Sequence, residues 1–283
     1  QDALMRRVAQ VNPNTIAVVM SGAPIDMRAW LDDVPAVLQA WYGGQEQGHA
    51  IADVLFGYVN PCGKLPVTFP KRLEDTPAAL DDPGENGVTR YAEGLFVGYR
   101  YYDRRDVAPA FPFGHGLSYT TFEYSEPSAV VVEGNTVPQV RLSVRVTNTG
   151  DRAGSEVVQL YLHDQVSGLI RPVQELKAFD KIQLAPGESR VVDFYLGPRA
   201  LAFFDPLQNA WIVEPGGFEA RFSSSSRDVR QSVDFAVAGG YRLDAGPGHC
   251  WVSSEPRPRG ATALRDILAR PESRAVLGRY MQK

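Results

Sequence analysis

The feature that most constrains the fold is a strand–helix–strand pattern in residues 40–70. The pair Gly43-Gly44 follows a short apolar run, and it lets the backbone turn sharply because glycine reaches positive φ without steric cost. After this turn, apolar residues recur with the period of an α-helix, at Ile51, Val54, Leu55 and Tyr58. Gly57 ends the predicted helix, and Leu65–Phe69 is predicted to be another extended run. Such a unit is typical of an α/β layered protein.

The residues before this unit predict one helix and two strands. Gln1–Val11 has a helical apolar face, formed by Leu4, Met5, Val8 and Val11. Thr15–Met20 is apolar without alternation, which is typical of a strand covered on both faces of a parallel sheet. Val37–Trp41 is predicted to be the next strand. The sequence therefore predicts a mostly parallel sheet with helices.

The segment after residue 70 is expected to be less regular. Residues 71–90 are polar and rich in Asp, Pro and Gly, which predicts a long surface loop. The aromatic run Leu95–Tyr102 is predicted to be extended. Residues 108–119 are predicted to lead out of this domain.

Beyond Phe122 the apolar pattern changes to the period of half-buried strands. Apolar and polar residues alternate in Val140–Val146, Val158–Leu162 and Val192–Leu196. Two shorter predicted strands, Trp211–Val213 and Phe218–Phe222, lie on either side of a Pro-Gly-Gly turn. Several short strands separated by turn residues predict a β-sandwich over residues 123–240.

Residues 241–283 are predicted to be a linker followed by a short helical tail. Proline and glycine mark the linker, and Pro271 separates two small apolar faces. Helices this short cannot fold alone. We therefore expect the tail to dock on a larger surface, either in the same polypeptide or in a second subunit of a homo-oligomer.

Composition and charge exclude several classes of protein. A net charge of −4 over 283 residues, without a basic run, argues against nucleic-acid binding. No apolar run approaches the roughly 18–20 residues that a membrane span needs. Cys62 and Cys250 are far apart in the sequence and are predicted to be two free thiols. The chain has no initiator methionine and no signal-peptide pattern, so we expect it to be the C-terminal part of a longer polypeptide.

Four ordered segments carry a resemblance to a known family. They are residues 40–70, Tyr91–Asp103, Phe111–Phe122, and Arg171–Phe179 together with Leu184–Glu188. They resemble family 3 glycoside hydrolases, the β-glucosidase family. The resemblance implies an α/β plus all-β fold: part of the family's α/β sandwich domain (1–122), a fibronectin type III-like β-sandwich (123–240), and the linker and tail (241–283).

The resemblance also implies a function. The complete enzyme would be a retaining exo-β-glucosidase, which hydrolyses terminal non-reducing β-D-glucosyl residues. In this family the nucleophile is an Asp in a preceding barrel domain, and the acid/base is a Glu upstream of the strand that corresponds to Thr15–Met20. Neither motif is in this sequence, so we assign no catalytic, substrate-binding or metal-binding residue and expect the chain alone to be inactive. The implied partners are the barrel-containing N-terminal portion and a β-glucoside or oligosaccharide, and acid/base glycoside hydrolysis needs no cofactor.

Two alternatives remain open at this point. The first is a β-xylosidase or another family 3 exo-glycosidase, since the residues that grip the sugar lie mostly upstream. The second is a non-catalytic module that binds carbohydrate or protein through the β-sandwich. The sequence shows no exposed aromatic stripe that would favour it.

Several acidic residues are candidates for a role at the sugar. Glu46 is predicted to stabilise the first turn of a helix through the helix dipole, with a sugar-facing role as the alternative. Glu93 is predicted to pair with Arg100 and hold a loop, with a position near the sugar pocket as the alternative. The mixed-charge run Asp103–Asp106 is predicted to be a solvated loop.

Glycine, histidine and aromatic residues give weaker candidates. Gly43–Gly48 lacks the spacing of a phosphate-binding loop, and the four dispersed histidines lack metal-ligand spacing. Large aromatic residues of α/β domains mostly lie in cores. The candidates for stacking on a sugar, of which Trp30 is the best, are Trp30, Trp41, Tyr42, Tyr99, Tyr101 and Tyr102. The loop His163–Arg171 is a further candidate for reaching the cleft of the assembled enzyme.

Overall fold

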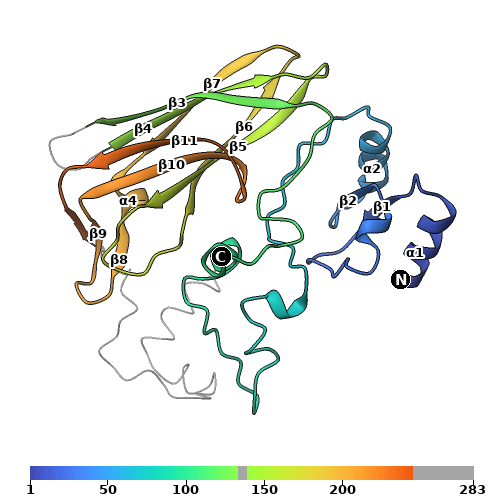
Figure 1. Cartoon of the computed structure of the whole chain (residues 1–283), viewed down its shortest axis with the longest axis horizontal. Helices are drawn as coiled ribbons and strands as arrows, with labels where there is room; N and C mark the ends of the chain where they lie inside the picture. The colour runs from blue at the N-terminus through green and yellow to red at the C-terminus, as the bar shows by residue number, and fades with distance from the viewer. Residues whose placement is uncertain (133–138, 245–283) are drawn as a thin grey trace, which may run out of the picture.

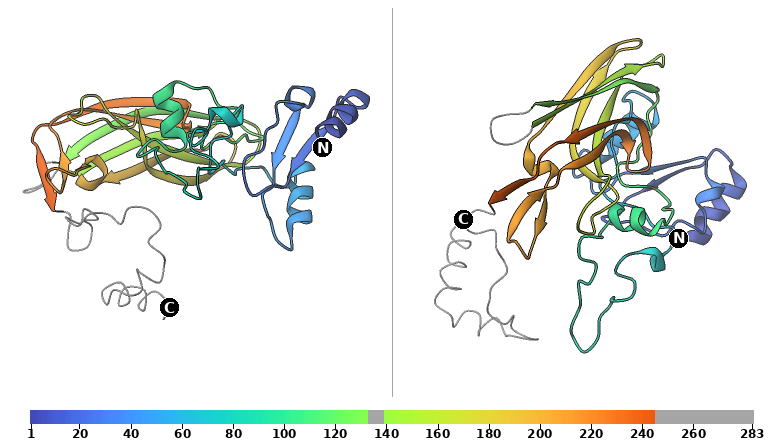
Figure 2. Two further views of the ribbon diagram at one scale, coloured as in Figure 1. Left: turned by 90° about the horizontal axis from the view of Figure 1, so that it is seen from below. Right: turned by 60° about the vertical axis from the view of Figure 1, so that its left-hand side comes forward.

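The computed structural model describes residues 1–132 and 139–244. A small α/β unit and a β-sandwich lie beside one another, and a long irregular segment connects them (Figure 1). Figure 2 shows the same separation from two other sides. Among the described residues, no helix has the length and apolar character that crossing a bilayer requires.

The α/β unit contains two helices and a two-stranded parallel sheet. Its elements are α1 (Asp2–Val11), β1 (Ile16–Val19), β2 (Ala36–Gln39) and α2 (Gln47–Leu55). Ile16 pairs with Ala36 and Val19 with Gln39, so β1 and β2 are parallel, as predicted. Gly44 has a φ of +71°, which confirms the sharp turn before α2. A small core holds the unit together and consists of Ala9, Ala17, Met27, Trp30, Val34 and Phe69.

The prediction that the first strand is covered on both faces is wrong for the described chain. Ala17 is buried, whereas Ile16 is 48% exposed and Val18 is 37% exposed. The helix α1 shows the same one-sided burial, because Leu4 and Val8 are exposed while Met5 packs on the core. Within residues 1–132 and 139–244, several apolar side chains of α1 and β1 therefore remain only partly covered.

The irregular segment corrects two further predictions. Leu65–Phe69 forms no strand; Phe69 makes a single antiparallel bridge to Phe111, and Leu65 exchanges backbone hydrogen bonds with His115 and Gly114. The second half of the predicted extended run is instead the helix α3 (Tyr99–Arg105), which follows Gly98 at a φ of +55°. Residues 71–90 form an irregular loop with one short 3₁₀ turn at Leu73–Asp75, as predicted.

The β-sandwich confirms the predicted alternating strands. One sheet contains β3 (Phe122–Val132), β4 (Gln139–Asn148) and β7 (Ser189–Leu196), in the order β3-β4-β7. The other contains β5 (Gly154–Asp164), β6 (Glu175–Leu184), β10 (Gly216–Ser225) and β11 (Asp228–Val237), in the order β11-β10-β5-β6. A small third sheet contains β8 (Phe203–Asp205), β9 (Ala210–Val213) and β12 (Tyr241–Asp244), next to α4 (Pro198–Leu201). All pairings in these three sheets are antiparallel.

The core of the sandwich lies between the two larger sheets. Val140, Leu142 and Val144 of β4 are fully buried in one cluster with Val158 and Leu160 of β5. Their polar neighbours in β4 face outward, which is the pattern expected of an antiparallel sheet with one wet face.

Candidate functional site

Polar side chains gather at the seam between the sandwich and the rest of the chain. At one place, Oδ1 of Asp103 in α3 lies 2.8 Å from Nε of Arg227, in the turn between β10 and β11. The amide of Gln174 donates to the other carboxylate oxygen of Asp103 at 3.1 Å. Burial raises the pKa of Asp103, although the positive charge of Arg227 opposes this shift.

A second group of charges surrounds Glu175 at the start of β6. Nζ of Lys177 lies 3.1 Å from its carboxylate, and Arg171 and Arg100 lie at 3.2 and 3.4 Å. Burial alone would raise the pKa of Glu175, but the three cations outweigh it and lower the pKa below its usual 4.5. Since Arg100 belongs to α3, this group also joins the helix to the sandwich.

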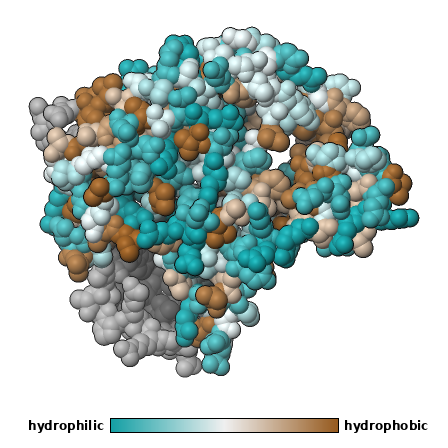
Figure 3. All heavy atoms as spheres, in the orientation of Figure 1, coloured by the Kyte–Doolittle hydropathy of each residue, from teal (hydrophilic) through white to brown (hydrophobic). Residues whose placement is uncertain are grey.

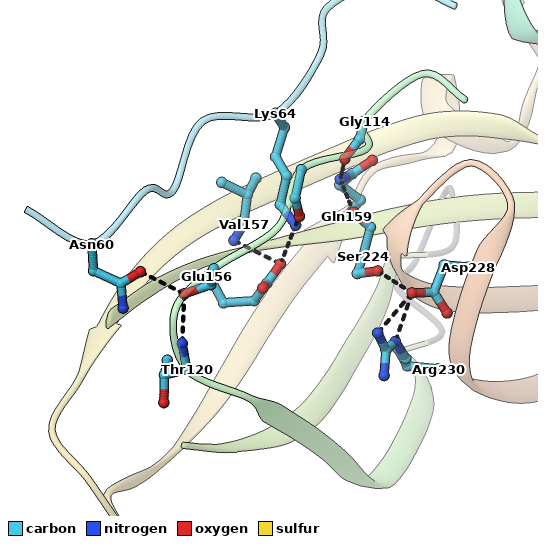
Figure 4. Close-up of polar contacts among 12 residues, drawn as sticks. Asn60, Lys64, Gly114, Thr120, Glu156, Val157, Gln159, Ser224, Asp228 and Arg230 are labelled. Carbon is cyan, nitrogen blue, oxygen red and sulfur yellow. Dashed lines mark hydrogen bonds and ion pairs between the residues drawn. The ribbon is translucent and has the colours of Figure 1, made fainter. Parts of the chain in front are cut away.

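A third group joins the segment after α2 to the sandwich (Figure 4). Nζ of Lys64 lies 2.9 Å from Oε1 of Glu156 in β5, and both side chains are largely buried. The Asn60 amide donates to the Ala153 carbonyl at 3.0 Å and accepts from the hydroxyl of Ser118 at 2.9 Å. The two parts of the chain are therefore connected by ion pairs and hydrogen bonds at several separate places.

The acidic residues weighed in the sequence do not come together. Glu46 is exposed at the start of α2 and lies 2.8 Å from Nδ1 of His49, which favours the structural role. The predicted pairing of Glu93 with Arg100 is wrong, because Arg100 pairs with Glu175. The predicted solvated loop is also wrong for Asp103, whose side chain is buried in the last part of α3. These acids therefore do not form a facing carboxylate pair.

The aromatic candidates lie mostly in packed surroundings. Trp30 is 4% exposed and belongs to the core of the α/β unit, so its ring is not available to a sugar. Tyr99 stacks on Phe113 with ring centroids 5.0 Å apart and accepts a hydrogen bond from the Leu176 N–H. Tyr42 is exposed, directly before the glycine turn.

The remaining candidates have local structural roles. In the candidate loop His163–Arg171, Nη1 of Arg171 lies 2.6 Å from the Asp164 carboxylate, in a buried ion pair. No cluster of three metal-ligating side chains exists in the part of the chain that the structure describes. Cys62 is a free thiol, and Cys250 and the predicted helical tail lie outside the described residues.

Lys64, Glu156 and Glu175 of the seam were not singled out in the sequence, although one signal points to Glu156. Glu156 lies in phase with Val158, Leu160 and Leu162, the inward-facing positions of β5. A carboxylate at an inward strand position needs a buried partner, because an unpaired buried charge is costly. The partner, Lys64, is too distant in sequence to be identified by spacing.

The surface of the α/β unit offers a different kind of site. The exposed apolar residues of α1 and β1 include Leu4, Val8, Val11, Ile16 and Val18. Apolar side chains are visible over this unit at the right of Figure 3. A two-stranded sheet with one bare apolar face is the kind of surface that another structural layer covers.

Comparison with known proteins gives two family matches. Residues 1–119 match the glycosyl hydrolase family 3 C-terminal domain, and residues 156–226 match the fibronectin type III-like domain. A beta-glucosidase of Bacteroides ovatus is 46% identical over 83% of the chain, and thermostable beta-glucosidase B of Acetivibrio thermocellus is 42% identical over 100% of it. These alignments cover 32% and 36% of the two relatives, so the chain spans about a third of their length.

A solved structure gives the same result. Beta-glucosidase 3B of Thermotoga neapolitana, in complex with glucose, has a TM-score of 0.80 and 39% identity. The match covers 86% of this chain and 34% of that one. The predicted resemblance and the predicted combination of an α/β part with a fibronectin type III-like domain are therefore confirmed.

Proposed function

The chain belongs to glycosyl hydrolase family 3, of which it carries the C-terminal domains, and we propose that it is the scaffold portion of a retaining exo-β-glucosidase. In the complete enzyme, a terminal β-D-glucosyl residue would be released by double displacement between two carboxyl groups. Both carboxyl groups would come from the N-terminal portion, and this chain would supply no catalytic residue. Its role is to complete the α/β layer that carries the acid/base and to hold it against the sandwich.

The observation that carries this proposal is the bare apolar side of the α/β unit. Ile16 and Val18 of β1 are only partly covered by described residues, and Leu4 and Val8 of α1 are exposed. Burying such side chains contributes about 25 cal/mol for each Å² of apolar area. The occupant we propose is the N-terminal portion of the same enzyme, because the curated relatives are about three times as long as the matched region.

The proposed division of labour follows the domains at 1–122, 123–240 and 241–283. Residues 1–122 supply the exposed apolar surface of α1 and β1, on which the N-terminal portion docks. Residues 123–240 hold this domain in place through the contacts at the seam. Residues 241–283 are proposed to dock either on the same enzyme or on a second copy of it. The proposed substrate is a β-glucoside or oligosaccharide, because the relatives are beta-glucosidases and one was solved with glucose.

The test is reconstitution from two chains. The purified chain and a separately expressed N-terminal portion are each assayed with an aryl β-glucoside, and then assayed as a mixture. We expect turnover only in the mixture, and comparison with an aryl β-xyloside identifies the preferred sugar. Enzyme-like turnover by this chain alone would overturn the proposal.

A further inference from the structure

A long loop, which we call the arm, consists of residues 73–97 and exposes several large apolar side chains. Figure 1 and Figure 2 show that it leaves the body of the molecule and returns to it at α3. Leu80 is 98% exposed, and Tyr91 is 89% exposed. The other exposed apolar residues of the arm are Leu73, Val88, Leu95 and Val97. Apolar side chains gathered in this way on a soluble chain are typical of a surface that binds a partner.

The two ends of the arm line an open groove of about 600 Å³. Leu73 and Val97 form its wall on the side of the arm, and Tyr102 and Phe113 form another part of the wall. The lining is mostly apolar. An apolar groove is the kind of surface into which an amphipathic helix docks, through residues spaced by three and four positions.

The arm is also acidic. It contains six Asp and Glu residues and a single Arg, so its net charge is −5. The carboxylate of Asp75 pairs with Arg72. Within the described ranges, Asp81, Asp82 and Glu85 form no ion pair. A partner that matches this surface therefore combines apolar residues with basic ones.

The C-terminal residues of the same chain have this combination. Two sets of apolar residues recur there with helical spacing: Leu264, Ile267 and Leu268, and then Val276, Leu277 and Tyr280. Residues 255–283 contain seven Lys and Arg residues and three Asp and Glu residues, which gives a net charge of +4. Residues 1–254 contain 22 and 30 of these, which gives −8. The tail and the arm are therefore complementary in charge.

The linker before the tail is long enough to reach the arm. The described chain ends at Asp244 in β12, and Leu264 follows 20 residues later. Twenty residues span up to about 65 Å when extended, whereas a compact chain of this length has a radius of gyration of about 19 Å. In Figure 1 the small third sheet and the arm both lie on the lower side of the molecule.

We propose that residues 264–280 dock on the arm and in the groove at its base. Their apolar faces cover Leu73, Leu80 and Val97, and their arginines lie near the carboxylates of the arm. The inference rests on the part of the proposed function that assigns residues 241–283 to docking, and it names one surface of the same chain as the docking site.

Hydrogen exchange of the full chain, measured by mass spectrometry of the tail peptides, tests the proposal. Amides of short helices exchange freely unless the helices dock, so docking appears as protection. We expect protection in the wild type and exchange about tenfold faster in Leu73→Asp, because docking would bury a carboxylate in the groove. Leu207→Asp is the matched control, since Leu207 is 94% exposed in the turn between β8 and β9 and should leave exchange of the tail unchanged.

A second pair of variants tests the charges. Asp82→Lys should speed exchange of the tail, whereas Asp151→Lys, at an exposed turn of the sandwich, should not. A wild-type tail without protection would overturn the proposal and leave the groove to the N-terminal portion. Protection that decreases on dilution would also overturn it, in favour of a second copy. These results do not depend on glucoside turnover in the reconstituted mixture, so they are distinguishable from a failure of the enzymatic proposal.

Discussion

Asp103 and Arg227 form an ion pair of 2.8 Å across the seam, one from the last part of α3 and the other from the β10–β11 turn. The Asp103 side chain is buried, whereas the Arg227 side chain is partly exposed. If Arg227 is removed, the buried carboxylate of Asp103 therefore loses its positively charged partner, which destabilises the folded state.

The first prediction concerns this pair. Arg227→Met should lower the free energy of unfolding by about 3 kcal/mol, because the buried carboxylate keeps only the Gln174 amide as a partner. Urea unfolding of the full chain measures the change. Arg190→Met is the matched control, since Arg190 pairs with Glu188 on the exposed surface and should lose at most about 1 kcal/mol. Equal losses in both variants would contradict the prediction.

The second prediction concerns pH and Glu175. Its pKa in the folded state lies below the usual 4.5, so the unfolded chain takes up a proton first as the pH falls. The contribution of Glu175 to the free energy of unfolding is therefore fully present above pH 4.5 and decreases as the pH falls below it. Glu175→Gln should flatten this acid limb in unfolding curves recorded at several pH values. Parallel pH profiles for variant and wild type would show that Glu175 does not contribute.

The third prediction concerns the backbone at Gly114. This residue has a φ of +79°, and a Cβ there would meet the Gln159 side chain, whose amide donates to the Gly114 carbonyl. Gly114→Ala should therefore cost about 1–3 kcal/mol in chemical unfolding. Gly63→Ala is the control, because a Cβ at Gly63 meets nothing within 4 Å. A loss in Gly63→Ala as large as in Gly114→Ala would refute the steric argument.

The fourth prediction tests the docking face. Ile16→Asp should leave the stability of this chain within about 0.5 kcal/mol, because Ile16 is half exposed. In the reconstituted enzyme, the same change should weaken association roughly tenfold or more, because a carboxylate would be buried without a partner. Titration of one portion with the other, followed by activity, measures the loss. Val130→Asp, on the sandwich, should have no such effect, and equal weakening by both would place the interface elsewhere.

Much of the sandwich could be predicted from the sequence, because alternation reports burial directly. Val140–Val146 alternates strictly, and each apolar side chain in it is buried. At the start of strand β6, buried and exposed residues do not alternate. Glu175 and Lys177 form an ion pair at the seam there, and they do not pack in the sandwich core. The pattern that identifies strands thus fails where the strand has a second role.

The helix α3 and the seam could not be predicted for a related reason. The run Tyr99–Tyr102 is aromatic and has a local preference for strands. Its helical form is stabilised by distant partners, such as Phe113 stacked on Tyr99. The burial of Trp30 could not be predicted either, because Phe69 of the same core is distant in sequence. The absence of a catalytic residue stays a prediction.

The hydrogen bond from Asn60 to the Ala153 carbonyl and the Asp103–Arg227 pair lie at separate points along the same boundary. A single contact would allow residues 1–122 to rotate relative to the β-sandwich, whereas two separate contacts prevent this rotation. The two described domains should consequently tumble in solution as one body, with a shared rotational correlation time instead of one for each.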